Sequence, residues 1–151
     1  MFEPNGSAAF QSGPAITYQQ HRQIMKKALL FLVPLLCAMS IHASEFPEIS
    51  VQELDQAIAQ KKVTVIDVNG TESWQQGRIP GAIDFTAQKA RLSSLLPKDK
   101  DALIVAYCGG PRCGAYQAAA KAAKDLGYTN VKHLKAGISG WKAAERKVEK
   151  S

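Results

Sequence analysis

From Ser50 onward, two kinds of hydrophobic segment alternate along the chain. Continuous apolar and β-branched runs occupy residues 63–68 and 103–108, without regular polar alternation. Such runs are typical of strands that are buried on both faces of a parallel sheet. Apolar residues at helical spacing separate them. The pattern predicts an α/β fold, a small parallel sheet with helices on both faces.

Start and stop signals place the individual elements. Ser50-Val51-Gln52-Glu53 has the form of a helix capping box, and Pro97 and Gly127 are helix stops. Ile79-Pro80-Gly81-Ala82 predicts a rigid turn before a brief strand. We expect helices at 50–60, 87–96, 114–126 and 138–147, a helical turn at 72–76, and strands at 63–68, 82–85, 103–108 and 131–134. The last helix should place Trp141 on its inner face.

The first 43 residues follow another pattern. Met25-Lys26-Lys27 is basic, residues 28–39 are apolar, and residues 40–43 end on the small Ala43. This layout is typical of a secretory signal peptide, and the run is shorter than the about twenty residues of a bilayer span. We predict an extension at 1–24, a signal peptide at 25–43, and a periplasmic or secreted domain at 44–151 with no stable membrane anchor after processing. An uncleaved amphipathic or buried helix is the alternative.

Charge and ligand-type residues exclude two classes of partner. The formal net charge is +6, but the basic residues are scattered among acidic ones, so no nucleic-acid partner is predicted. Cys108 and Cys113, together with His133 further along the sequence, provide three of the four ligands that a structural zinc site needs. Neither a metal nor a cofactor is therefore predicted. No heptad or large apolar face indicates an oligomeric state.

Both cysteines beyond the leader lie in one glycine-rich connection after the strand at 103–108. Ligands of parallel sheets bind beyond the carboxyl ends of the strands. Gly109 and Gly110 allow their amides to turn toward one point, where an anionic sulfur on Cys108 would meet them, a helix start and Arg112. These groups would lower the pKa of the Cys108 thiol from its ordinary value of about 8.5, which favours the thiolate.

Three separated segments resemble the rhodanese-like domain family: "VIDVNGTESWQQGRIPGAIDF", "YCGGPRCGAY" and "LGYTNVKHLKAGISGW". In that family, inward-facing amides of a short loop surround a cysteine that ends a strand. The resemblance covers about residues 49–141, with the motifs in the family's order. It implies a rhodanese-like fold and a sulfurtransferase. Cys108 would take a sulfane sulfur from a small donor such as thiosulfate, hold it as a persulfide, and pass it to a thiol or similar acceptor.

The resemblance also implies a set of site residues. Catalytic residues would be Cys108, Cys113 and Arg112, and substrate-binding residues would be Gly109, Gly110, Pro111, Gly114, Asp67 and Arg78. Plainer alternatives exist for several of them. Cys108 would be a small buried hydrophobe, Arg112 a solvated cation, and Asp67 a strand-end turn former. Tyr107 is expected to pack in the core or at the rim.

The sequence departs from the family pattern at three positions. Asn69 replaces the usual arginine, and Ala136 replaces the first glycine of the closing pair. Cys113 stands five residues after Cys108, where many members carry arginine. It is a resolving thiol that attacks a persulfide or sulfenic acid on Cys108, a disulfide partner, or a small packed residue; the spacing permits a bridge without requiring one. Reduction of the thiols in place would need a protein reductant outside the cytoplasm.

Three other classes of protein are alternatives to a sulfurtransferase. Cysteine phosphatases and arsenate reductases place an arginine six residues after the cysteine, where this chain has Gly114. A thiol–disulfide redox protein that uses Cys108 and Cys113 suits an oxidising compartment, although the spacing is not Cys-x-x-Cys. A non-catalytic binding module on the same fold stays open, because fold alone does not fix function.

Overall fold

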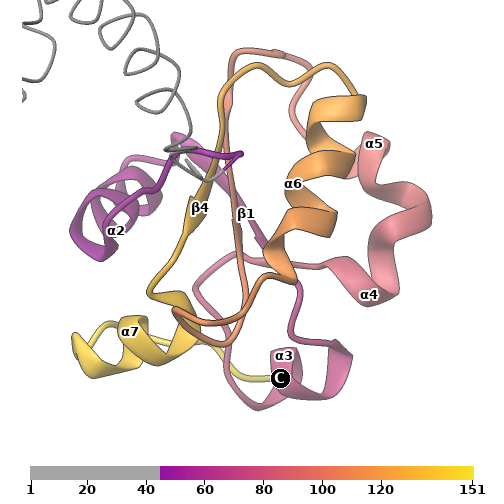
Figure 1. Ribbon diagram of the computed structural model, residues 1–151. Helices are drawn as coiled ribbons and strands as arrows, with labels where there is room; N and C mark the ends of the chain where they lie inside the picture. Colours follow the sequence, from indigo (N-terminus) through magenta and orange to yellow (C-terminus); the bar gives the residue numbers. More distant parts are fainter. Residues whose placement is uncertain (1–44) are drawn as a thin grey trace, which may run out of the picture. The chain divides into compact units, whose positions relative to one another are not determined.

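The sheet at the centre of the molecule has four parallel strands. The computed structural model describes residues 45–151, and Ser44–Ser151 form a compact unit. The strands β1 (Val63–Asp67), β2 (Ile83–Asp84), β3 (Leu103–Tyr107) and β4 (Val131–Leu134) lie in the order β2-β1-β3-β4 (Figure 1). Parallel neighbours need crossover connections, and helices supply them here. The predicted α/β class is confirmed, whereas the predicted extension and signal peptide lie outside the described residues.

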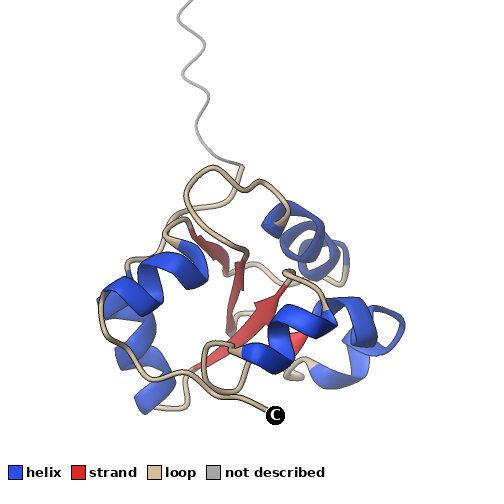
Figure 2. Ribbon diagram, turned by 90° about the horizontal axis from the view of Figure 1, so that it is seen from below, coloured by secondary structure: helices blue, strands red, loops and turns tan. Residues whose placement is uncertain are grey.

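Helices lie on both faces of the sheet (Figure 2), and each face carries its own hydrophobic core. Val65 and Val105 point to one face, where α2 (Val51–Ala59) and α7 (Gly137–Ala143) cover them with Leu54 and Trp141. Ile66, Ile104 and Ala106 point to the other face. This alternation follows from the period of two in a strand, and it explains why β1 and β3 read as continuous apolar runs.

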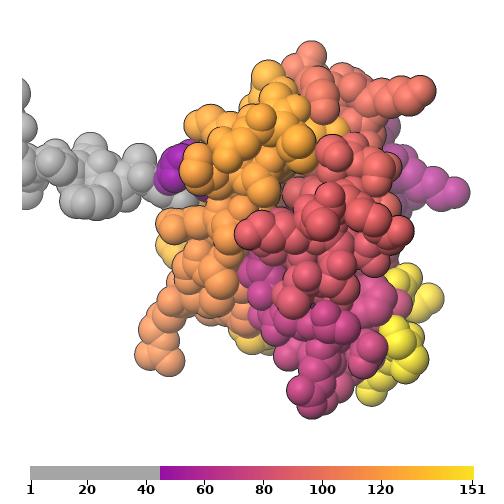
Figure 3. Space-filling view, turned by 90° about the vertical axis from the view of Figure 1, so that its right-hand side faces the viewer, coloured from indigo at the N-terminus to yellow at the C-terminus, as the bar shows by residue number. Residues whose placement is uncertain are grey.

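The second face is covered by α4 (Phe85–Gln88), η2 (Lys89–Arg91), α5 (Leu92–Leu95) and α6 (Tyr116–Asp125). The contact face of α6 consists of Ala119, Ala120 and Ala123, all fully buried. Such small side chains let the helix lie close to the strands beneath it. Figure 3 shows this side, with α6 in orange beside the salmon residues of η2 and α5. Within residues 45–151 no helix has the length and apolar character to cross a membrane.

Three predicted helices differ from the structure. The helix expected at 87–96 is wrong as one piece: the Asp84 side chain accepts a hydrogen bond from Ala87 N at 3.2 Å and starts α4 early, and the 3-10 segment η2 divides the rest. Asp84 thereby also ends β2 before Phe85. The helix expected at 138–147 stops at Ala143, because Glu145 is left-handed (φ +56°) and the N–H groups of Glu145 and Arg146 bond back to Lys142 O at 2.9 Å and Trp141 O at 3.2 Å. Glu149 then pairs with Arg78 through N–O bonds of 3.0 Å in both directions.

The third difference concerns the helix after the cysteines. It was expected from residue 114, but α6 begins at Tyr116, because a tight turn closes first with a bond from Cys113 N to Gly110 O of 3.0 Å. Elsewhere the predicted bounds agree within one or two residues, the usual spread of helix and strand ends. The capping box is present in α2, where Ser50 N donates to Glu53 Oε2 and Glu53 N donates to Ser50 Oγ. Trp141 points inward as predicted, and helix α3 (Thr71–Gln76) fills the predicted turn.

Candidate active site

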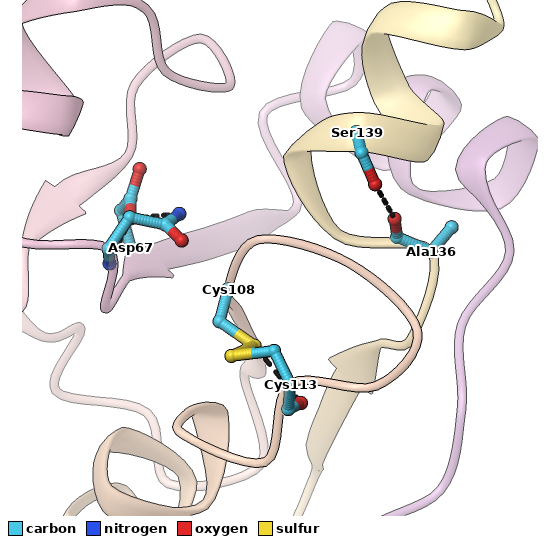
Figure 4. The surroundings of a disulfide bond; sticks show 6 residues. Asp67, Cys108, Cys113, Ala136 and Ser139 are labelled. Atoms are coloured by element: carbon cyan, nitrogen blue, oxygen red, sulfur yellow. Dashed lines mark hydrogen bonds between the residues drawn. A yellow bond between two sulfur atoms is a disulfide. The ribbon is translucent and has the colours of Figure 1, made fainter.

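The cysteine loop (residues 108–115) connects β3 to α6 at the carboxyl edge of the sheet. Its two cysteines form a disulfide, with Cα atoms 6.3 Å apart, inside the usual range of about 4.4–6.8 Å (Figure 4). Cys108 is 3% exposed, whereas Cys113 is half-buried. The Sγ atom of Cys108 also lies 3.1 Å from the carbonyl oxygen of Cys113. Of the readings left open for Cys113, the structure shows the bridged one.

Helix α7 fixes the cysteine loop through main-chain atoms. Ile138 N donates to Cys108 O at 2.9 Å, and Ser139 N donates to Gly109 O at 3.0 Å. All peptide bonds described are trans, so the N–H of each peptide group points opposite to its C=O. The N–H groups of Gly109 and Gly110 therefore point away from α7. Within residues 45–151 neither has a hydrogen-bond acceptor, which leaves both amides available to an anion.

Gly137 allows this close approach of helix and loop. Its φ of +59° lies in the left-handed region, and a Cβ atom there would stand 2.5 Å from both Cys108 O and Gly110 N. No side chain fits such a gap without moving the backbone. Gly110 is less constrained, since a Cβ there would lie 2.7 Å from Ser139 Oγ, a side-chain atom that can rotate away. The sequence reasoning did not include Gly137 or Ser139 in the site. Gly137 is the second glycine of the closing pair in the family pattern, after Ala136, so the sequence did contain a signal for its role.

An open pocket of about 440 Å³ lies beside the loop. Its walls are Gly110, Pro111, Arg112, Cys113 and Ser139. Arg112 is exposed, and in the described part of the chain its side chain makes no ion pair or hydrogen bond. It therefore places an unneutralised positive charge at the pocket. Gly114 is exposed and follows Cys113 toward α6, outside the residues that line the pocket.

Asp67 ends β1 in register with Tyr107, the residue before Cys108. It is 1% exposed, and its carboxylate accepts hydrogen bonds from Asn69 N and Asn69 Nδ2, both at 2.7 Å, and from the Tyr107 hydroxyl. That hydroxyl accepts in turn from Ile79 N at 3.1 Å. Burial, and then the negative charge of Asp67, raise the pKa of Tyr107, so the phenol stays protonated and donates.

The turn formed by Asp67 and Asn69 lies beside the loop. A Cβ atom on Gly109 would be 3.7 Å from Asn69 Oδ1, an ordinary contact distance. The loop therefore lies between Asn69, which is near Gly109, and α7, which donates hydrogen bonds to the loop carbonyls. The donors around Asp67 occupy its oxygens, so the structure shows it as a group that positions the strand ends. Its role in substrate binding stays a prediction, and Tyr107, expected only to pack, is a second polar member of this network.

Arg78 contacts the C-terminal segment. Its Nε atom lies 3.6 Å from Glu149 Oε2, its Nη1 donates to Ser151 Oγ at 3.0 Å, and its guanidinium stacks 3.7 Å from the centre of the Trp74 ring. Figure 3 shows these C-terminal residues in yellow next to the magenta residues that precede β2. Arg78 is not among the residues that line the pocket, and its predicted part in binding stays a prediction.

His133 is a core residue of β4. It is 2% exposed, its Nδ1 lies 3.0 Å from Phe46 O, and its ring stacks on Tyr116 with centroids 4.1 Å apart. In residues 45–151 no three His, Cys, Asp or Glu side chains are grouped so as to hold a metal ion. The groups that the cysteine loop itself offers to a ligand are its two sulfurs, the amides of Gly109 and Gly110, and the guanidinium of Arg112.

Fold and loop together define a class: small parallel α/β domains with a cysteine loop after a central strand. The chain belongs to the rhodanese-like domain family, whose family model matches residues 50–144. It is 28% identical over 102 residues to thiosulfate sulfurtransferase GlpE of Shewanella oneidensis, covering 67% of this chain and 97% of that protein.

Other relatives match only part of the sequence or resemble the chain mainly in its fold. HTH-type transcriptional regulator Rv0324 of Mycobacterium tuberculosis is 39% identical over 89 residues, which cover 58% of this chain and 38% of the regulator. The BH2092 protein of Bacillus halodurans has a TM-score of 0.55 and 26% identity, covering 87% of this chain and 85% of that one. SseA of Escherichia coli, a 3-mercaptopyruvate sulfotransferase, shares the fold with a TM-score of 0.57 at 19% identity, over 69% of this chain and 51% of its own.

Proposed function

We propose that this domain is a sulfurtransferase in which Cys108 carries a sulfane sulfur, as a persulfide, from a small donor such as thiosulfate to a thiol acceptor. One observation carries the proposal: Cys108 lies at the carboxyl end of a central strand, followed by the amides of Gly109 and Gly110, which point away from α7 and lack acceptors among residues 45–151. Membership of the rhodanese-like family and the similarity to GlpE support the reaction class.

The first half-reaction starts from the reduced loop. The Cys108 thiolate attacks the outer sulfur of thiosulfate, the S–S bond of the donor breaks, and sulfite leaves with the bonding electron pair. The free amides of Gly109 and Gly110 would then stabilise the negative charge of the persulfide, as an oxyanion hole stabilises an alkoxide. Arg112, exposed at the pocket, attracts the anionic donor.

The second half-reaction returns the enzyme to its starting state. An acceptor thiolate attacks the outer sulfur of the persulfide, and the Cys108 thiolate leaves. The disulfide state has no free thiolate, so a reductant has to open it before a sulfur is loaded. Export by the leader at 25–43 would place the domain in a compartment where such a disulfide persists, and a protein reductant would then be its partner.

The test measures sulfur loading on a chain that cannot re-form the bridge. The remaining cysteine of the sequence, Cys37, is replaced by serine in every variant, so that only the two thiols of the loop can react. Reduced Cys113→Ser protein, freed of reductant and given thiosulfate, should gain about 32 Da and release sulfite. A Cys108→Ser/Cys113→Ser control should gain nothing. Unchanged mass in the Cys113→Ser protein would contradict the proposal.

The disulfide also supports a second candidate, a thiol–disulfide exchange protein. Such a protein would exchange its bridge with dithiols and disulfides, but it would neither retain sulfur from thiosulfate nor release sulfite. Sulfite measured after a single addition of thiosulfate to reduced protein therefore separates the two functions. Failure of the reduced protein in both assays would favour a non-catalytic binding module.

A further inference from the structure

The two cysteines of the loop are unequal in their access to solvent. Cys108 is 3% exposed, whereas Cys113 is half-buried and lines the open pocket with Gly110 and Arg112. A large thiol that approaches the loop therefore reaches Cys113 before it reaches Cys108. A bridge whose ends differ in this way is reduced at the accessible sulfur first.

The loop has its own supports apart from the bridge. Main-chain bonds from Ile138 N and Ser139 N hold its start, and the bond from Cys113 N to Gly110 O closes its turn. A disulfide across a separation of five residues also closes a short loop, for which the gain from chain entropy is smallest. Stabilisation of the fold by the disulfide is therefore a weak explanation for the presence of Cys113 in the loop.

The position of Cys113 suits attack on the sulfur of Cys108. The bridged structure shows that the two Sγ atoms bond with Cα atoms 6.3 Å apart, while the contacts with α7 remain in place. This bridged form is also the product expected if Cys113 attacks a persulfide on Cys108. The positive charge of the neighbouring Arg112 favours the thiolate form of an attacking sulfur.

We propose that Cys113 discharges the Cys108 persulfide, so that this domain releases the transferred sulfur as sulfide and depends on an external dithiol. The inference rests on the sulfurtransferase function proposed above. The Cys113 thiolate attacks Sγ of Cys108, and the bond between Sγ and the outer sulfur breaks. The outer sulfur leaves with that electron pair and takes up the proton that Cys113 released to solvent on ionising, so it departs as hydrosulfide. The products are the disulfide of the structure and one sulfide.

An external dithiol then resets the loop. One of its thiolates attacks Sγ of Cys113, and the Cys108 sulfur leaves as a thiolate, which the free amides of Gly109 and Gly110 would stabilise. The second thiol of the dithiol releases Cys113. In sum, thiosulfate and a dithiol give sulfite, sulfide and an oxidised dithiol, so the two electrons that reduce the sulfane sulfur come from the dithiol.

A single-turnover experiment on the full chain tests this step. Protein with Cys37→Ser is reduced, freed of reductant and mixed with thiosulfate, and sulfite, sulfide and protein mass are followed. The chain with both loop cysteines should release roughly one sulfide per sulfite and end about 2 Da lighter than its reduced form. Cys113→Ser should release sulfite only and keep a gain of about 32 Da, and Cys113→Ala should behave alike.

The outcomes separate this inference from the function on which it rests. If both loop cysteines are present, sulfite forms and the added sulfur stays on the protein without sulfide, Cys113 is not the resolving thiol and the inference is wrong. If the Cys113→Ser protein takes up no sulfur and forms no sulfite, the sulfurtransferase proposal itself fails. Cys108→Ser is the matched control, with Cys113 as its loop thiol, and it should give neither product. Circular dichroism of each variant confirms that it is folded.

Discussion

The ends of β1 and β3 lie at the same edge of the sheet but differ in whether their polar groups have hydrogen-bond partners. The turn after β1 is closed, since the carboxylate of Asp67 is satisfied by Asn69 and Tyr107. The loop after β3 is open, since the amides of Gly109 and Gly110 have no acceptor within the described residues. A closed polar group stabilises structure, whereas open donors bind something from outside. We therefore expect the chemistry at the end of β3 and structural support at the end of β1.

The two ends also differ in what holds them. The β1 turn is shaped by its own side chains, through Asp67 and Asn69. The cysteine loop is shaped by the backbone of α7, an element that comes later in the chain. Damage to the first should therefore cost stability alone, whereas damage to the second should also slow sulfur transfer. The following predictions test that division.

The largest effect is expected from Gly137→Ala. Its Cβ would meet Cys108 O and Gly110 N at 2.5 Å, at a φ of +59°, so α7 has to move away from the loop. We expect a loss of roughly 2–4 kcal/mol in the free energy of unfolding and sulfur loading slowed more than about tenfold. Urea unfolding and the mass assay measure these. Gly77→Ala is the control, since its Cβ has only a 3.6 Å contact with Lys142; equal effects in both variants would contradict the role of α7.

Tyr107→Phe should mainly reduce stability. It leaves Asp67 short of a donor and Ile79 N without its acceptor, at a cost of about 1–3 kcal/mol. The raised pKa of Tyr107 means that its stabilisation is fully present below the ordinary value of about 10 and is lost as pH rises above it. Urea unfolding between neutral and alkaline pH should therefore show a decline that the variant lacks. Sulfur loading slowed as much as in Gly137→Ala would remove the distinction between the two strand ends.

Arg112→Gln should leave stability unchanged, because the side chain is exposed and makes no ion pair among residues 45–151. Its loss should slow loading from anionic thiosulfate by roughly three- to tenfold and reduce the salt dependence of the rate. Rates at low and high ionic strength measure this. An unchanged rate at low salt would show that Arg112 is a solvated cation without a part in the reaction.

The smallest effect is expected from Glu149→Gln. It weakens the ion pair with Arg78, whose atoms are 3.6 Å apart, and such partly exposed pairs contribute about 0–1 kcal/mol. Thermal unfolding should shift slightly, and loading should be unaffected because neither residue lines the pocket. A clear change in the loading rate would instead connect Arg78 to the site, as the sequence resemblance suggested.

Local signals predicted the fold well and the site only in part. The apolar runs of β1 and β3 and the capping box at Ser50 depend on neighbouring residues, so the sequence displays them directly. The contact of Asp67 with Tyr107 joins residues 40 positions apart, and that of Arg78 with Ser151 joins residues 73 apart. Such pairs depend on strand register and on the path of the C-terminal segment. The break at η2 was missed because Asp84, outside the apolar pattern, sets where the first turn begins.

The way in which α7 grips the loop has a consequence for redesign. Its bonds go to the carbonyl oxygens of Cys108 and Gly109, which every amino acid possesses. The exposed side chains of Pro111 and Arg112 take no part in that grip. Pro111 and Arg112, which both line the pocket, can therefore be substituted without disturbing the bonds between α7 and the loop, and we expect such substitutions to change what binds there while the fold is kept.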